Sequence, residues 1–132
     1  MKRYFSGVVW WLAFVGGSLA DLLGGVDQLL QSLFFFMIAD YISGIFQAGY
    51  HKVLNSKIGF QGLVKKSLTL LMIMISVELE KLLGQTLPFR EMTIMFYLAN
   101  EGLSLLENIG SVIPLPKKIR QYFSQLKDKA DE

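Results

Sequence analysis

The sequence predicts an all-α integral membrane protein with about four transmembrane helices, a C-terminal amphipathic cytoplasmic helix, and assembly into a homo-oligomer. Hydrophobic residues make up 52% of the 132 residues and mean hydropathy is +0.42. Both values are high for soluble domains, in which roughly 45 to 50% of residues are apolar. Four apolar runs are separated by two short turns and a longer basic loop, and the basic residues gather in a few segments. We expect a transmembrane region over residues 1–113 and a basic tail over 114–132.

The composition excludes several kinds of site. The chain has no cysteine and one histidine, His51, which excludes disulfides and thiol chemistry and leaves little for a zinc or haem site. No acid has a nucleophile or base at usable spacing, no phosphate-binding loop is complete, and the basic segments have too few aromatics for nucleic acid. We therefore expect no enzyme activity, no cofactor, no metal and no nucleic-acid partner.

The first apolar run covers residues 4–23 and is uncharged as far as Asp21. About 20 residues are enough to cross a bilayer. The run also resembles a signal peptide, because a basic start precedes it and "SLA" stands before Asp21. A second apolar run follows at once after "GGVD", so we expect a retained span. Small residues at helical spacing let helices approach closely in lipid, which predicts helix packing at Gly16, Gly17, Ala20, Gly24 and, in the second run, Gly44.

The second run covers residues 28–50 and contains one acid, Asp40, with Ser43 on the same helical face. A polar, basic loop follows it. Basic charge beside membrane spans is typical of contact with lipid head groups, which we expect for the lysines of this loop: Lys52, Lys57, Lys65 and Lys66.

The third run covers residues 67–83 and carries charges near its end. Only residues 67–77 are free of charge, so it crosses only if Glu78, Glu80 and Lys81 reach the far interface. A buried or re-entrant helix is the alternative.

The fourth run covers residues 91–113 and carries a polar stripe. Helical spacing places the stripe on one face, and its members are Asn100, Glu101, Ser104, Glu107 and Asn108. A carboxylate at mid-membrane costs about 3 kcal/mol, so the stripe faces protein or water. Two interpretations stay open: polar groups that join helices, and the lining of a water path.

The tail places Ile119, Tyr122, Phe123 and Leu126 on one face of an amphipathic helix. Head-group contact is expected for Lys117, Lys118 and Arg120. Of the thirteen Lys and Arg residues, two precede the first run, four lie in the middle loop, five lie in the tail, and two lie around the third turn. With four spans, the positive-inside rule places both termini in the cytoplasm and Asp21, Asp27, Arg90 and Glu91 outside.

Several motifs resemble the toxin secretion/phage lysis holin family. They are "MIADYISGIFQA", "NSKIGFQGLVKKS", "NEGLSLLENIG" and "PLPKKI", between about Asp40 and Ile119. The resemblance implies a protein of the bacterial cytoplasmic membrane that associates with itself and with lipids. It then permeabilises the membrane so that an endolysin or a large toxin leaves, without a required direct contact.

Two other functions stay open. A small ion or proton channel, or a transporter subunit, could relay protons through Asp40 and Glu101. A scaffold without a pore would use the stripe only to join helices.

Overall fold

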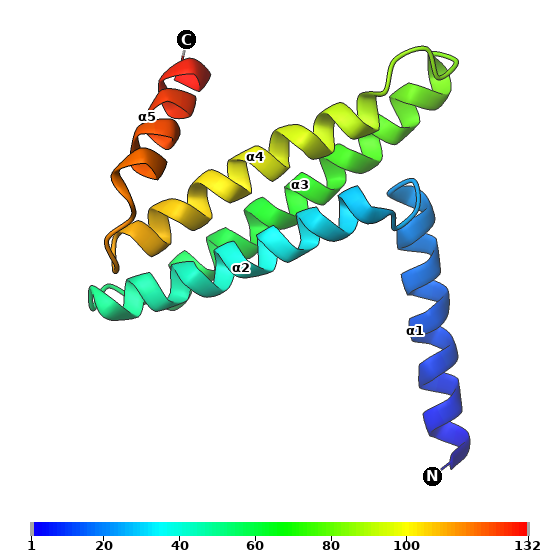
Figure 1. The fold of residues 1–132 in the computed structure, drawn as a ribbon. Helices are drawn as coiled ribbons and strands as arrows, with labels where there is room; N and C mark the ends of the chain where they lie inside the picture. Colours follow the sequence, from blue (N-terminus) through cyan, green and yellow to red (C-terminus); the bar gives the residue numbers. More distant parts are fainter. Residues whose placement is uncertain (1, 132) are drawn as a thin grey trace.

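The structure is a computed structural model that describes residues 2–131, and these residues form five α-helices without a strand among them (Figure 1). The all-helical prediction is confirmed. Met1 and Glu132 lie outside the described residues, as do the side chains of residues 2, 3, 123 and 126–131; the predicted roles of Phe123 and Leu126 in the tail fall there. The helices are α1 Lys2–Leu22, α2 Gln28–Tyr50, α3 Ser56–Leu82, α4 Phe89–Gly110 and α5 Lys117–Asp131.

Helices α2, α3 and α4 form an up-down-up bundle (Figure 1). Helix α4 packs along both α2 and α3, whereas α2 and α3 contact each other sparsely. The turn between α1 and α2 and the turn between α3 and α4 therefore lie at one end of the bundle, and the other two turns lie at the opposite end.

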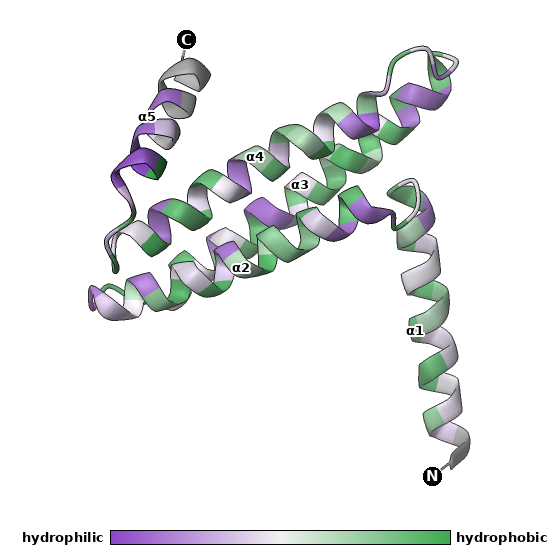
Figure 2. Cartoon of the chain, in the orientation of Figure 1, coloured by the Kyte–Doolittle hydropathy of each residue, from purple (hydrophilic) through white to green (hydrophobic). Residues whose placement is uncertain are grey.

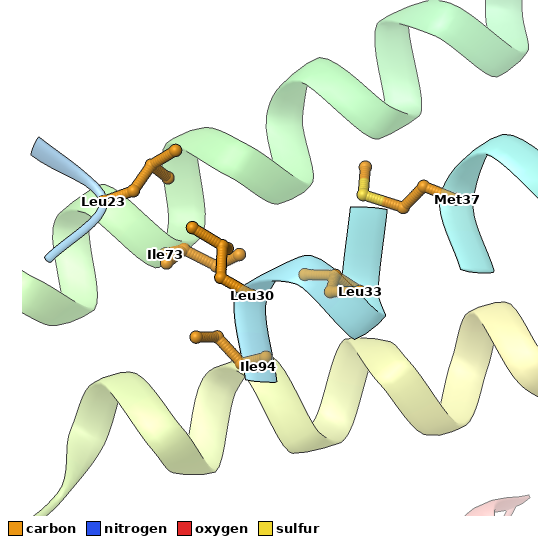
Figure 3. Close-up of a cluster of buried hydrophobic side chains, with 6 residues drawn as sticks. All are labelled: Leu23, Leu30, Leu33, Met37, Ile73 and Ile94. Carbon is orange, nitrogen blue, oxygen red and sulfur yellow. The ribbon is translucent and has the colours of Figure 1, made fainter. Parts of the chain in front are cut away.

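A compact apolar core occupies the half of the bundle nearest the α1–α2 turn (Figure 3). Its side chains come from that turn and from all three bundle helices, and four of them are fully buried. Helices joined by such interdigitated aliphatic side chains keep one register. The core residues are Leu23, Leu30, Leu33, Met37, Ile73 and Ile94.

Two side-chain caps fix where bundle helices begin. Asp27 accepts a hydrogen bond from the Leu30 amide at 3.0 Å, and Asn55 accepts one from the Ile58 amide at 2.9 Å. Such caps satisfy amides that have no partner inside the helix. Because Asn55 starts α3, the helix is 27 residues long, and the segment that we expected to be a loop as far as Lys66 is mostly helical.

Helices α1 and α5 lie outside the bundle. Residues 4–19 of α1 are all exposed, and α1 runs away from the bundle rather than along α2 (Figure 1). Among the described residues, two helices are long and apolar enough to cross a membrane, Tyr4–Leu22 and Gln28–Tyr50. The coloured part of α5 is mainly hydrophilic (Figure 2).

Candidate functional site

Three charged side chains from three helices meet in the half of the bundle away from the apolar core. Lys66 of α3 donates to Asp40 of α2 at 2.7 Å and to Glu101 of α4 at 2.6 Å. Their side chains are only 12 to 16% exposed. One ammonium and two carboxyl groups thus meet in this charged cluster of Asp40, Lys66 and Glu101.

Two neutral side chains extend the charged cluster. The Asn108 amide of α4 donates to the Asp40 carboxylate at 3.1 Å, to its main-chain carbonyl at 3.2 Å and to the Ser43 hydroxyl at 3.1 Å. The Ser43 hydroxyl in turn donates to the Asp40 carbonyl at 2.9 Å. Polar groups buried away from water need such partners. The network joins α2 to α4 beside the ion pairs.

A groove of about 470 Å³ opens beside the charged cluster, between α2, α3 and α4. Asn100, Ser104 and Gln47 also line it. Glu107 lies apart, on the groove between α4 and α5 with Arg120. The predicted stripe therefore divides: part of it joins helices, part lines an open groove, and Glu107 faces α5.

The prediction for Lys66 was wrong. Sequence grouped it with the head-group lysines, but its ammonium binds two carboxylates inside the bundle. Lys65, one residue earlier on α3, is exposed, as are Lys52 and Lys57. The positions of Lys117, Lys118 and Arg120 on exposed faces of α5 leave head-group contact for them as a prediction. Neither Asp40 nor Glu101 carries a sequence signal that identifies Lys66 as their partner.

The second polar site is at the opposite end of the bundle, where Arg90 of α4 meets the α1–α2 turn. Its guanidinium donates to the Asp27 carboxylate at 2.7 and 3.2 Å, to the Leu23 carbonyl at 2.6 Å and to the Gly25 carbonyl at 2.8 Å. Arg90 is only 6% exposed, and its predicted place on the outer side of the membrane stays a prediction. Hydrogen bonds from Arg90 and from the Leu30 amide hold the pKa of Asp27 below its usual value.

Among the described residues, nothing packs against Gly16 or Gly17 on the small-residue face of α1. A Cβ built on Gly16 or Gly17 meets nothing within 4 Å. Gly24 was expected on the same face, but α1 ends at Leu22 and Gly24 lies in the turn with φ +81°. Gly44 faces α4, since a Cβ there would lie 3.5 Å from the Asn108 amide nitrogen.

The polar side chains of both sites are paired with one another. Within the described part of the chain, no group of three His, Asp or Glu side chains could hold a metal ion, and every buried side-chain nitrogen or oxygen has a hydrogen-bond partner. The charged cluster joins three helices at a largely buried site, where an unpaired charge is costly.

Comparison with known proteins identifies related chains. An uncharacterized 14.9 kDa protein of Clostridium perfringens is 34% identical over 98% of this chain and 99% of its own length. An uncharacterized protein of Listeria monocytogenes is 43% identical over 75% of this chain and 73% of its own. A protein of Bacillus phage phi105 named probable holin is 27% identical over 92% of both chains. No solved structure matches.

The model of the bacteriophage holin family matches residues 17–128, which include the whole bundle, the charged cluster and the α1–α2 turn. The family is a membrane-permeabilising, non-enzymatic one. With its two apolar helices, the chain is a membrane protein, and it belongs to the bacteriophage holin family.

Proposed function

We propose that this protein assembles with itself in the bacterial cytoplasmic membrane and opens lesions through which an endolysin or a large toxin leaves. Four helices, α1 to α4, cross the bilayer, both termini lie in the cytoplasm, and α5 lies on the inner leaflet. The passenger needs no direct contact with the lesion. The charged cluster of Asp40, Lys66 and Glu101 is the observation that carries this proposal.

The charged cluster gives the polar stripe two acceptable environments. In the closed chain, the ammonium satisfies both carboxylates between the helices. Lipid cannot replace these ion pairs, because each charge at mid-membrane costs about 3 kcal/mol. Water can solvate the separated charges, and the groove lined by Asn100 and Ser104 adjoins the charged cluster. Separation of the helices is therefore tolerable only where an assembly admits water between them.

Self-assembly is favoured by surfaces that the closed chain leaves unused. Helix α1 exposes its apolar side chains and its small residues together, with open space around Gly16 and Gly17. Small faces of this kind associate in lipid through close backbone approach. Because α1 runs away from the bundle (Figure 1), the four-span arrangement requires α1 to rotate about the α1–α2 turn.

The ion-pairing of the acids favours a lesion over a proton relay. Both Asp40 and Glu101 bind the Lys66 ammonium, at 2.7 and 2.6 Å, which holds their side chains between the helices. A relay would need at least one of them to be released.

Solute size tests the proposal. The protein is induced in bacteria that also make a folded, endolysin-sized cytoplasmic reporter, and reporter release and membrane potential are followed together. We expect release of the reporter at the moment of depolarisation. Leu33→Asp, which buries a charge in the core, is the non-functional control. Depolarisation without release would assign an ion channel, and neither event in cells with inserted protein would leave a scaffold.

A further inference from the structure

The end of α1 is tightly ordered by backbone hydrogen bonds. The Gly25 amide donates to the Ala20 carbonyl at 2.8 Å, and the Gly24 amide donates to the Asp21 carbonyl at 3.0 Å. Gly24 and Gly25 both have positive φ, +81° and +93°. This pattern is a Schellman motif, which ends a helix with its last carbonyls satisfied. The motif makes the turn continuous with α1.

Arg90 ties this ordered turn to α4. Its guanidinium binds the carbonyls of Leu23 and Gly25, which the Schellman motif leaves free, and the carboxylate of Asp27. Asp27 also caps α2. One buried side chain thus connects the end of α1, the start of α2 and the start of α4.

Among the described residues, α1 is held to the bundle chiefly through its end, where Leu23 packs in the apolar core and Arg90 binds the turn. Residues 4–19 are exposed over the whole length of the helix, and α1 has no extensive packing with any other helix. The turn lies directly on the guanidinium, since a Cβ on Gly24 would be 2.5 Å from the Arg90 Nε. The direction of α1 therefore depends on the turn and on Arg90.

We propose that Arg90 is a latch: its hydrogen bonds to the α1–α2 turn fix the direction in which α1 leaves the bundle, and their release lets α1 rotate. The first part stands on the contacts alone. The second part rests on the proposed function, because only the four-span arrangement requires α1 to lie along α2.

Distances between spin labels test the latch. The chain has no cysteine, so Val8→Cys on α1 and Phe35→Cys on α2, both exposed, give a unique pair in lipid nanodiscs. We expect one narrow distance distribution in the parent and, in Arg90→Gln, a distribution wider by about twofold or more, because the turn then loses its hydrogen bonds to α4 and keeps only the packing of Leu23. Arg90→Lys should widen it as well, since an ammonium lacks the planar fork that binds several acceptors.

A matched control removes an equal charge nearby. Lys81 forms an exposed ion pair with Glu78 three residues away, at the same end of the bundle, and Lys81→Gln should leave the distribution narrow. Gly24→Ala keeps Arg90 but places a Cβ against its guanidinium, and should widen the distribution as Arg90→Gln does.

A second pair, Phe35→Cys with Phe96→Cys on α4, reports on the bundle itself. The latch is supported if Arg90→Gln widens only the α1–α2 distribution. The latch is overturned if the α1–α2 distance distribution of Arg90→Gln stays narrow, or if that of the parent is already as wide as the variant's. It is also overturned if the α2–α4 distribution widens equally. None of these outcomes depends on reporter release, so failure of the latch and failure of the proposed function are distinguishable.

Discussion

At the scale of single residues, Lys66 matters more than its neighbours because it balances two acids at once. Asp40 and Glu101 both approach its ammonium within 2.7 Å. Removal of one partner from a buried ion pair is more costly than removal of both, because a single unpaired charge remains. Loss of Lys66 leaves two carboxylates side by side without a counter-ion.

We predict that Lys66→Met lowers the free energy of unfolding by about 2 to 4 kcal/mol, somewhat less than for fully buried pairs, since the site is partly exposed. Glu101→Gln should cost less, because the Asp40 ion pair remains. In the double variant, Glu101→Gln should recover part of the loss, a coupling of about 1 to 3 kcal/mol. Unfolding in mixed micelles measures all four proteins, and Lys65→Met, at the exposed adjacent position, is the control.

Equal losses of unfolding free energy for Lys65→Met and Lys66→Met would contradict the stabilising role of the Lys66 ion pairs. The absence of coupling between Lys66 and Glu101 would contradict it as well. Glu101→Gln also bears on the two interpretations of the stripe. If the carboxylate only joins helices, the onset of permeabilisation should not change. If it helps to set the balance between closed and open packing, the onset should shift while insertion and oligomers stay normal.

At the scale of elements, the hydrogen bonds at the end of each helix set the direction in which the chain leaves it. Helix α2 ends as α1 does: the Val53 amide donates to the Ala48 carbonyl at 2.9 Å and the Lys52 amide to the Gly49 carbonyl at 3.2 Å. Here, however, Lys52 takes the position that usually holds glycine, with φ +58°. A side chain in this left-handed conformation costs about 1 kcal/mol.

Lys52→Gly should therefore raise the free energy of unfolding by about 0.5 to 1 kcal/mol. Lys65→Gly removes the same charge from the interior of α3 and should lower stability by about 1 kcal/mol. Thermal unfolding of the two variants beside the parent measures the difference. A Lys52→Gly variant that is less stable than the parent would mean that the Lys52 side chain makes a stabilising contact that outweighs its backbone strain.

The sequence predicted these elements unevenly, for physical reasons. Apolar runs locate α1, α2 and α4 to within a few residues. The start of α3 was missed because its first eleven residues mix five polar or charged side chains with two glycines and four apolar residues, although the cap at Asn55 is a recognisable signal. The polar stripe of α4 was predicted from its spacing. Its partner Lys66 lies 35 residues away from Glu101, and Arg90 binds carbonyls 65 and 67 residues away; periodicity holds no information on such pairings.

At the scale of the whole molecule, the two polar sites bracket the apolar core. Asp27 and Asp40 are separated by about 20 Å along α2, at 1.5 Å per residue. The hydrocarbon core of a bilayer is about 30 Å thick. In the proposed four-span arrangement, the α1–α2 turn lies at one interface and the charged cluster lies inside the hydrocarbon layer, where separation of its charges requires water.

The same geometry predicts topology. The contacts of Arg90 place the α1–α2 turn beside the start of α4. The α1–α2 and α3–α4 turns, which contain residues 26 and 86, therefore lie at one end of the bundle, and the start of α3 at Ser56 lies at the other (Figure 1). The basic residues gather at the end that holds residue 56 and in the tail, and the positive-inside rule places that end in the cytoplasm. Val26→Cys and Thr86→Cys should both react with an impermeant maleimide in intact cells, while Ser56→Cys and Ser124→Cys should react only after permeabilisation. Reaction of Ser124→Cys in intact cells would mean three spans, and different reactivity at positions 26 and 86 would mean that α2 and α3 do not cross the membrane as a pair.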